Sequence, residues 1–205
     1  IPSNIWVGVG KMSAEQVTFP LAPVYKKKGI TFHQALAQEI HPEGDSTTSS
    51  GYVQVTYTDP ARNGEVSKIE YDFLVNATGP KLNFAATPGL GPDGHTVSVC
   101  TFGHAMEAAK SLAQGIAVMK TGKRQSIAVG VGHGTCTCEG AAFEYAFNVE
   151  HEVRAAGVRD LADITYITNE YELGDFGVGG LVFSQQGFQT SSKMWTESLF
   201  RERGI

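Results

Sequence analysis

With 205 residues, the chain has the length of one or two domains and enough residues to bury a core. A net charge of −5, with no basic cluster beyond Lys26 to Lys28, gives no support for a nucleic-acid partner. No apolar run approaches the roughly 18 residues that a membrane-spanning helix needs, and three cysteines are too few, and an odd number, for a disulfide-stapled secreted scaffold.

The first part of the chain predicts a loop, a short helix and a strand. Residues 1–10 lack periodicity and contain a proline and two glycines, which predicts a loop. Residues 19–28 predict a short helix whose lysine-rich end is solvated and lies before Gly29. Residues 30–33 predict a strand, and the polar, serine-rich residues 43–51 predict a loop.

Three consecutive segments then predict an antiparallel β-meander. Residues 52–58 alternate between two faces, as a half-buried strand does. The turn residues of 59–64 lead into a returning strand at 65–71. Residues 72–76 predict a third, more apolar strand, which ends at the Ala-Thr-Gly-Pro sequence of residues 77–80.

The next predicted helix follows Cys100. Residues 97–99 are expected to form a strand that leads into Cys100, and Thr101 is the expected N-cap of a helix that Gly122 ends. The apolar positions of this helix share one face: Ala105, Ala109, Leu112, Ile116 and Met119.

The last third of the chain predicts a parallel pair of strands. Residues 127–129 and 164–167 are apolar strands, with a helix running to about Ala156 between them. This strand–helix–strand order predicts parallel pairing with a right-handed crossover. A glycine-rich loop over residues 171–189 and a helix over residues 192–202 follow.

The stretch from Ser126 to Glu144 organises the chain. Gly130 and Gly132 occupy the first two glycine positions of the dinucleotide-binding pattern G-x-G-x-x-G, but Thr135 occupies the third. Helical spacing resumes only after two added cysteines, Cys136 and Cys138. A loop that lengthens and gains thiols where a pyrophosphate would lie predicts sulfur chemistry.

Thiols at two helix starts are the candidate catalytic groups. Cys138 precedes a helix amino terminus, which favours a thiolate, although a buried small apolar role is the alternative. Cys136 is too near Cys138 for an unstrained disulfide, so we expect a spectator or auxiliary thiol. Cys100 has His104 one helical turn ahead, where the imidazole could take the thiol proton. Zinc binding by these four residues is disfavoured because C-x-C has no second paired motif.

Four motifs, in order and with similar spacing, resemble the sulfide:quinone oxidoreductases, a family of flavoproteins of the two-dinucleotide-fold class. These motifs are PSNIWVGVG at 2–10, NATGPKLNF at 76–84, CTFGHAMEA at 100–108 and CEGAAFEYA at 138–146. The resemblance extends over nearly the whole chain. It implies an α/β fold, part of a flavoprotein with two dinucleotide-binding-type domains (Rossmann-like, FAD/NAD(P)-binding) and an antiparallel β-meander.

The resemblance implies FAD as the cofactor and no metal. The residues that it places next to FAD come from the first two motifs: Pro2, Ser3, Asn4, Ala77, Thr78, Gly79 and Pro80. Cys100 would lie near the flavin, and Cys138 would form a redox pair with a third cysteine late in the family's chain, with sulfur bridging the two. Sulfide attacks that sulfur, electrons pass to FAD and a quinone removes them. His104 would assist proton handling.

The resemblance also implies a domain division and partners. Residues 1–122 would form the carboxyl-side part of the first FAD-binding segment, with the meander and a linking helix. Residues 123–205 would form the amino-side half of a second dinucleotide-type domain. The partners would be sulfide, quinone and, through a carboxyl-terminal region outside this chain, a membrane surface, with a homo-oligomer possible. The full-length protein would be a peripheral membrane protein, on the bacterial inner membrane.

Two departures and several absences qualify this expectation. The family pattern has proline at Ile5 and histidine at Asp175, so we expect the loop around Asp175 to supply no proton-handling imidazole. The amino-terminal dinucleotide motif and the third cysteine are expected outside this chain, because it starts at Ile1 and ends in what reads as the start of a strand. The 205-residue segment alone is therefore expected to be soluble, inactive and a weak binder of FAD.

Three other functions stay open on the sequence alone. A flavoprotein sulfide dehydrogenase that reduces cytochrome c shares this plan, and an export signal and a haem partner would distinguish it. A type II NADH dehydrogenase is disfavoured, because Thr135 and the inserted cysteines disturb the nicotinamide cofactor's pyrophosphate site. A catalytically silent binding module would tolerate replacement of Cys138 by serine.

Overall fold

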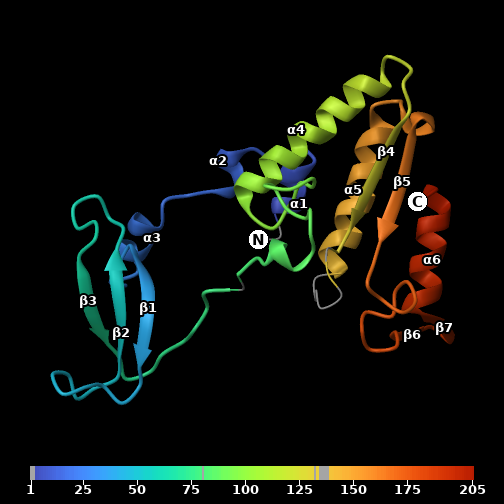
Figure 1. The fold of residues 1–205 in the computed structure, drawn as a ribbon. Coiled ribbons are helices and arrows are strands. Elements are labelled where there is room, and N and C mark those ends of the chain that lie inside the picture. The colour runs from blue at the N-terminus through green and yellow to red at the C-terminus, as the bar shows by residue number, and fades with distance from the viewer. Residues whose placement is uncertain (1–2, 80, 132, 134–138) are drawn as a thin grey trace. The chain divides into compact units, whose positions relative to one another are not determined.

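The computed structural model describes residues 3–79, 81–131, 133 and 139–205. The chain divides into two compact units. The larger unit comprises residues 1–18 and 82–205, and the smaller unit comprises residues 19–81. Both contain helices and strands, so the chain is a mixed α/β protein (Figure 1).

The larger unit contains a parallel pair of strands joined through a helix. Strand β4 (Gln125–Gly130) pairs in parallel with β5 (Ala162–Ile167), in a register that places Gln125 opposite Ala162 and Gly130 opposite Ile167. Helix α5 (Glu139–Ala155) lies between them in sequence and packs against both, and the short helix η2 (Arg159–Leu161) leads into β5. The predicted strand–helix–strand order and parallel pairing are therefore confirmed.

Gly130, at the end of β4, must be a glycine because the backbone of β5 comes very close to it. A Cβ atom at Gly130 would lie 1.9 Å from the carbonyl oxygen of Ile167, at the last residue pair of the ladder. No side chain can be accommodated at that separation. Gly130 therefore allows β4 to remain paired to its end.

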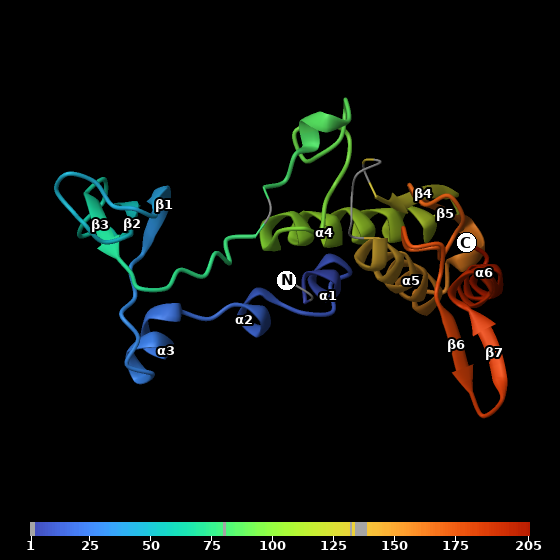
Figure 2. The ribbon, with the colours of Figure 1, turned by 90° about the horizontal axis from the view of Figure 1, so that it is seen from below.

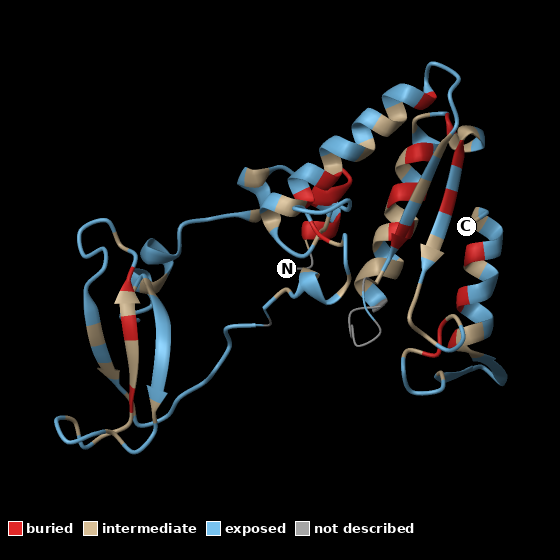
Figure 3. Cartoon of the chain, viewed as in Figure 1, coloured by how far each residue is buried: buried red, intermediate tan, exposed pale blue. Residues whose placement is uncertain are grey.

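The core of the larger unit lies between α5 and the parallel strands. Its buried members come from β4, α5, β5 and the end of α4 (Phe102–Met119): Val129, Ala146, Val149, Val153, Ala162, Ile164 and Met119, joined by Val9 and Val158. Figure 3 shows that the buried positions of α5 follow one face of the helix. This pattern is the helical spacing that the sequence predicted.

The carboxyl-terminal helix packs through aromatic rings. Helix α6 (Ser192–Arg203) begins at its N-cap Ser191 and ends at Gly204, which adopts the left-handed conformation typical of a helix C-cap. Phe200 of α6 is 4% exposed, and its ring centroid lies 5.3 Å from Phe143, 4.9 Å from Phe147 and 5.0 Å from Tyr166. The predicted helix over 192–202 is confirmed.

Two segments of the larger unit that were predicted as loops contain regular structure. Residues 4–8 form helix α1 (Asn4–Gly8), and α2 (Ala14–Val17) follows it. Residues 171–189 contain strand β6 (Val182–Gln185), which pairs with β7 (Phe188–Ser191) in an antiparallel hairpin. Helix α1 was missed because tertiary packing, which buries four of its five residues, stabilises it. The hairpin was missed because it turns at Gln186-Gly187, a pair with positive φ that is not a strong turn signal in sequence.

The smaller unit is a helix followed by the predicted β-meander. Helix α3 (Leu21–Lys27) ends before Gly29, with Lys26 and Lys27 exposed in its last turn. Strand β2 (Tyr52–Tyr57) is central and pairs in antiparallel fashion with β1 (Ala35–His41) and β3 (Val66–Glu70). The predicted pairing of residues 52–58 with residues 65–71 is confirmed.

The third strand of the meander was predicted at the wrong end of the sheet. Residues 72–76 form no strand, and Phe73 is 94% exposed. The third strand is β1, which begins after residues 30–33, and these residues also form no strand. A bulge between Ala37 and Glu39 shifts the register of β1, so the period-two pattern that identifies strands is broken there.

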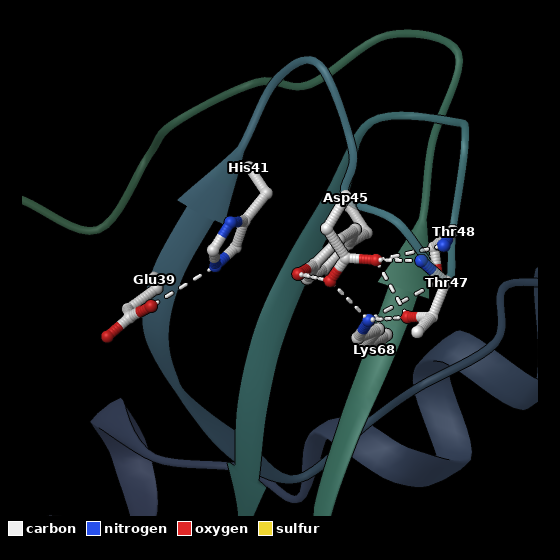
Figure 4. Close-up of polar contacts among 7 residues, drawn as sticks. Glu39, His41, Asp45, Thr47, Thr48 and Lys68 are labelled. Atoms are coloured by element: carbon white, nitrogen blue, oxygen red, sulfur yellow. Dashed lines mark hydrogen bonds and ion pairs between the residues drawn. The ribbon is translucent and has the colours of Figure 1, made fainter.

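The loop between β1 and β2 is fastened to the sheet by Asp45 (Figure 4). Oδ1 of Asp45 accepts hydrogen bonds from the backbone amides of Thr47 and Thr48, at 2.8 and 2.9 Å. Its Oδ2 accepts from the Tyr52 hydroxyl and from Lys68 Nζ, both at 2.6 Å. Lys68 first, then Tyr52 and Thr47, hold the pKa of Asp45 well below its usual range.

We expect the stability of the smaller unit to fall in acid because of Asp45. Its pKa is lower in the folded state, so the carboxylate stabilises the fold above the unfolded-state pKa of about 3.9 and loses that effect as the pH falls below it. Asp45→Asn should reduce the change in loop stability, measured by amide exchange over residues 43–51 between about pH 5 and pH 3. Asp72→Asn, at an exposed aspartate, is the control. An unchanged pH dependence in Asp45→Asn would contradict the assignment.

None of the helices in the described part of the chain combines the length and the apolar character that crossing a bilayer requires.

Candidate functional site

The candidate site is built first around the start of α4. Thr101 is the N-cap of this helix, and its Oγ1 accepts a hydrogen bond from the His104 amide at 3.3 Å, so the predicted cap is confirmed. Cys100 stands immediately before the cap and is exposed. Residues 97–99 form no strand, so Cys100 follows a loop, in which Ser98 Oγ accepts from the Cys100 amide at 3.1 Å.

His104 lies in the first turn of α4. Its Nδ1 atom is buried and has no hydrogen-bond partner, and its ring lies 5.8 Å from the ring of Phe84, in η1 (Phe84–Ala86). Among the described contacts, the backbone of Cys100 bonds to Asn4 and Ser98, whereas His104 contacts Thr101 through its amide and Phe84 through its ring. The thiol and the imidazole share one helix start, and none of these described contacts joins the two side chains.

Asn4 connects the first sequence motif to Cys100. The side chain is 2% exposed, and its Nδ2 donates to the Cys100 carbonyl oxygen at 3.3 Å, across 96 residues of sequence. Its Oδ1 is buried without a hydrogen-bond partner. A buried amide oxygen left unpaired costs about 1–3 kcal/mol, which makes it a natural acceptor for a bound group. The neighbouring Ser3 is half-buried and is the N-cap of α1, but its side chain makes no cap bond.

The second helix start of the site is that of α5. This helix begins at Glu139, directly after Cys138, but Cys136 and Cys138 lie outside the described residues. Two turns into α5, the Tyr145 hydroxyl donates to the Gly8 carbonyl oxygen at 2.9 Å. Burial raises the pKa of Tyr145 to about 12, so the phenol remains protonated and acts as a donor.

The remaining predicted cofactor neighbours lie in the smaller unit or outside the described residues. Ala77, Thr78 and Gly79 are exposed. Oδ1 of Asn76 accepts from the amide and hydroxyl of Thr78, at 3.2 and 2.9 Å, and Gly79 has a φ of +74°. The backbone of this turn is therefore accessible to solvent. Pro2 and Pro80 lie outside the described residues.

Asp175, where the family pattern has histidine, builds the loop that follows β5. The residue is 8% exposed, and its Oδ1 accepts from the Gly177 amide at 2.7 Å. Its carbonyl oxygen accepts from the amides of Val178 and Gly180. An anionic acceptor of this kind orders a glycine-rich turn, so Asp175 has a structural reason to be present where an imidazole was expected.

A buried glutamate with three arginines supports the elements behind the site. Glu150 of α5 is fully buried, and it accepts from Arg154 Nε at 2.7 Å, from Arg159 Nε at 3.3 Å and from Arg203 Nη1 at 3.3 Å. Arg159 also donates to the carbonyl oxygens of Ala162, Arg203 and Gly204, at 2.7 to 2.8 Å. The network thereby links α5, the start of β5 and the end of α6.

An open hollow beside this network is structural in character. It has a volume of about 530 Å³ and is lined by five arginines: Arg124, Arg154, Arg159, Arg201 and Arg203. Each is already bonded to a carboxylate, since Arg124 pairs with Asp163 at 2.7 Å, Arg201 pairs with Glu197 at 2.7 Å and the other three pair with Glu150. Three of the arginines share the one carboxylate of Glu150, and the acidic side chains of Asp160 and Glu202, which also line the hollow, bring its formal charges into balance.

Sequence reasoning found Cys100 and His104 but missed Gly8 and Tyr145. A Cβ atom at Gly8 would lie 2.8 Å from Val99 Cγ1 and 3.0 Å from Tyr145 Cε2, so the two helix starts approach α1 through this glycine. The only signal in the sequence was that Gly8 and Tyr145 both fall within the motifs that carry the family resemblance.

Fold and site together define a mixed α/β protein in which two helix starts, one carrying Cys100 and His104 and one following Cys138, contact a single short helix. The whole chain is 35% identical, over 205 residues, to a sulfide-quinone reductase of Aquifex aeolicus (strain VF5). No protein-family model matches. The family resemblance predicted from the four motifs is thus confirmed, and the chain spans 40% of the length of this reductase.

Proposed function

We propose that the protein containing this chain is an FAD-dependent sulfide:quinone oxidoreductase. The match to a sulfide-quinone reductase along the full chain supports this function. The observation that carries it to particular residues is the Asn4–Cys100 hydrogen bond, which joins a proposed cofactor neighbour to a proposed catalytic thiol. We also propose the Rossmann-like arrangement and the division at residues 122 and 123 for the parent flavoprotein.

Asn4 of α1 and His104 at the start of α4 fit a flavin in chemical character. Asn4 Oδ1 is a buried acceptor and His104 Nδ1 is a buried ring nitrogen, and both lack a partner among the described residues. A flavin's pyrimidine edge carries both N–H donors and carbonyl acceptors, so it could pair with groups of both kinds. Ser3 and the exposed turn at Ala77, Thr78 and Gly79 are proposed as further cofactor contacts, together with Pro2 and Pro80.

Cys138, Cys100 and His104 are proposed to have separate roles in the reaction. Cys138 is proposed as the thiol that carries sulfur, in a pair with a cysteine outside this chain, and Cys100 as the thiol near the cofactor. The start of α4 favours negative charge at its amino end, where Cys100 lies. His104, one turn further, is proposed to take and return a proton. FAD, when bound, supplies the acceptor for the two electrons that sulfide loses.

The proposed partners follow from the same activity. Sulfide is the reductant, and a membrane quinone is the oxidant. Contact with the membrane surface is proposed to come from residues outside this chain, giving a peripheral protein of the bacterial inner membrane that can form homo-oligomers.

The direct experiment is anaerobic reduction of the full-length protein's flavin. Sulfide should bleach the flavin absorbance, a quinone should restore it, and NADH should have no effect. Bleaching by NADH but not by sulfide would identify a nicotinamide-dependent dehydrogenase. Re-oxidation by cytochrome c but not by a quinone would replace the quinone with a haem acceptor. Either result would overturn the proposed function.

A further inference from the structure

Helix α1 packs against both helices whose starts form the candidate site. It contacts α4 and α5 (Figures 1 and 2), and Ile5 and Val7 are 6% and 3% exposed. A five-residue helix has little stability of its own. Its position is therefore set by what it contacts, and it can transmit a displacement of either neighbour to the other.

Polar contacts fasten α1 and the residues after it to each neighbour. On the side of α4, Asn4 Nδ2 donates to the Cys100 carbonyl oxygen at 3.3 Å. On the side of α5, the Tyr145 hydroxyl donates to the Gly8 carbonyl oxygen at 2.9 Å, and Lys11, just past α1, pairs with Glu152 at 3.1 Å. Both bonds of α1 itself involve buried or half-buried groups, where a hydrogen bond is hard to replace with water.

Gly8 brings the two sides together at one point. Its missing Cβ would contact Val99, the residue immediately before Cys100, and also Tyr145 of α5. A side chain at position 8 would push against both at once. The loop that leads to Cys100 and the helix that follows Cys138 are thus packed against the same backbone atoms of α1.

From these contacts we propose that α1 is the element that fixes the starts of α4 and α5 relative to each other, with Asn4 and Tyr145 as positioning residues for Cys100 and for the helix that follows Cys138. This inference rests on the proposed function only for the part that the thiols play. The mechanical coupling stands on the contacts themselves. Proximity of reacting groups is sensitive to displacements of about 1 Å, so such an element would affect rate without touching the reacting atoms.

Amide hydrogen exchange in the full-length protein tests the coupling without reference to activity. Tyr145→Phe removes only the bond to Gly8, yet residues 102–106 of α4 should exchange about fivefold faster, as expected when a bond supporting a segment is lost. Asn4→Leu should in turn accelerate exchange in residues 140–146 of α5. Acceleration confined to α1 and the helix that carries the substitution would overturn the proposal.

Two control variants distinguish coupling through α1 from a general loss of stability in the larger unit. Tyr171→Phe removes a hydroxyl from a side chain that is 95% exposed and should leave exchange in α4 unchanged. Asn148→Gly removes an amide bonded to the Glu144 carbonyl oxygen within α5, at 2.8 Å, and puts a poor helix former in the helix, so it should loosen α5 without affecting α4. Equal acceleration in α4 for Asn148→Gly and Tyr145→Phe would contradict a route through α1.

Kinetics test the positioning role separately. Per bound flavin, Tyr145→Phe should slow flavin reduction by sulfide about tenfold and leave re-oxidation by quinone unchanged, because reduction by sulfide requires the thiols and re-oxidation by quinone does not. Equal reduction rates in wild type and Tyr145→Phe would remove the positioning role. A wild-type protein whose flavin sulfide does not reduce would refute the proposed function instead, and the exchange result would still decide the coupling.

Discussion

Replacement of Glu150 by glutamine should destabilise the larger unit by about 3 kcal/mol, at the lower end of the cost of breaking a buried ion pair. The carboxylate is fully buried and accepts from three arginines on α5, α6 and the segment between α5 and β5. Glutamine keeps the volume but removes the charge, so Arg159, whose side chain is only 17% exposed, loses its compensating anion. The two other arginines reach solvent more freely, which limits the cost.

Urea unfolding of the full-length protein measures this effect. Glu197→Gln is the matched control, because Glu197 pairs with Arg201 on the surface of α6 and both side chains are more than half exposed. Such a surface pair contributes less than about 1 kcal/mol. Equal shifts of the unfolding midpoint in the two variants would show that the Glu150 network does not support the fold.

Several elements could be predicted from residues that are close together in the sequence. The Thr101 cap and the helix that follows it depend on side chain and backbone groups three residues apart, so the sequence contains all the information. The parallel pairing of β4 and β5 follows from two apolar runs separated by a helix. The paired strands β2 and β3 follow from alternation and a strong turn.

The elements that were missed owe their structure to contacts distant in sequence. Helix α1 is too short to show periodicity, and its residues Ile5 and Val7 are buried in a helix that packs against α4 and α5. Strand β1 contains a bulge, which destroys the alternation that identifies strands. The apolar run at residues 72–76 was read as a strand, although three of its side chains, Phe73, Leu74 and Val75, are exposed.

In the candidate site, too, the features set by neighbouring residues could be predicted, and the contacts between distant residues could not. Cys100 and His104 could be located because a thiol and an imidazole one turn apart at a helix start are recognisable in sequence. The bond from Asn4 to Cys100 spans 96 residues, and that from Tyr145 to Gly8 spans 137. No local sequence pattern predicts such pairs, so the role of α1 in the candidate site could be identified only from the structure.

Replacement of Cys138 by serine in the full-length protein should lower the rate of sulfide-driven flavin reduction by about 1,000-fold or more, as expected when a covalent nucleophile is removed. A hydroxyl cannot form the sulfur–sulfur bond on which the proposed chemistry depends. Cys136→Ser is the matched control, since it makes the same change two residues away at a thiol expected to be a spectator or an auxiliary thiol. This variant should retain the wild-type rate.

Mass spectrometry of the peptide containing Cys138, recovered under non-reducing conditions after turnover with sulfide, tests most directly whether this thiol carries sulfur. The wild-type protein should yield Cys138 with one or more added sulfur atoms, either free or bridged to a second cysteine, and the modification should persist in Cys136→Ser. An enzyme that turns over sulfide while Cys138 never acquires sulfur would contradict the account.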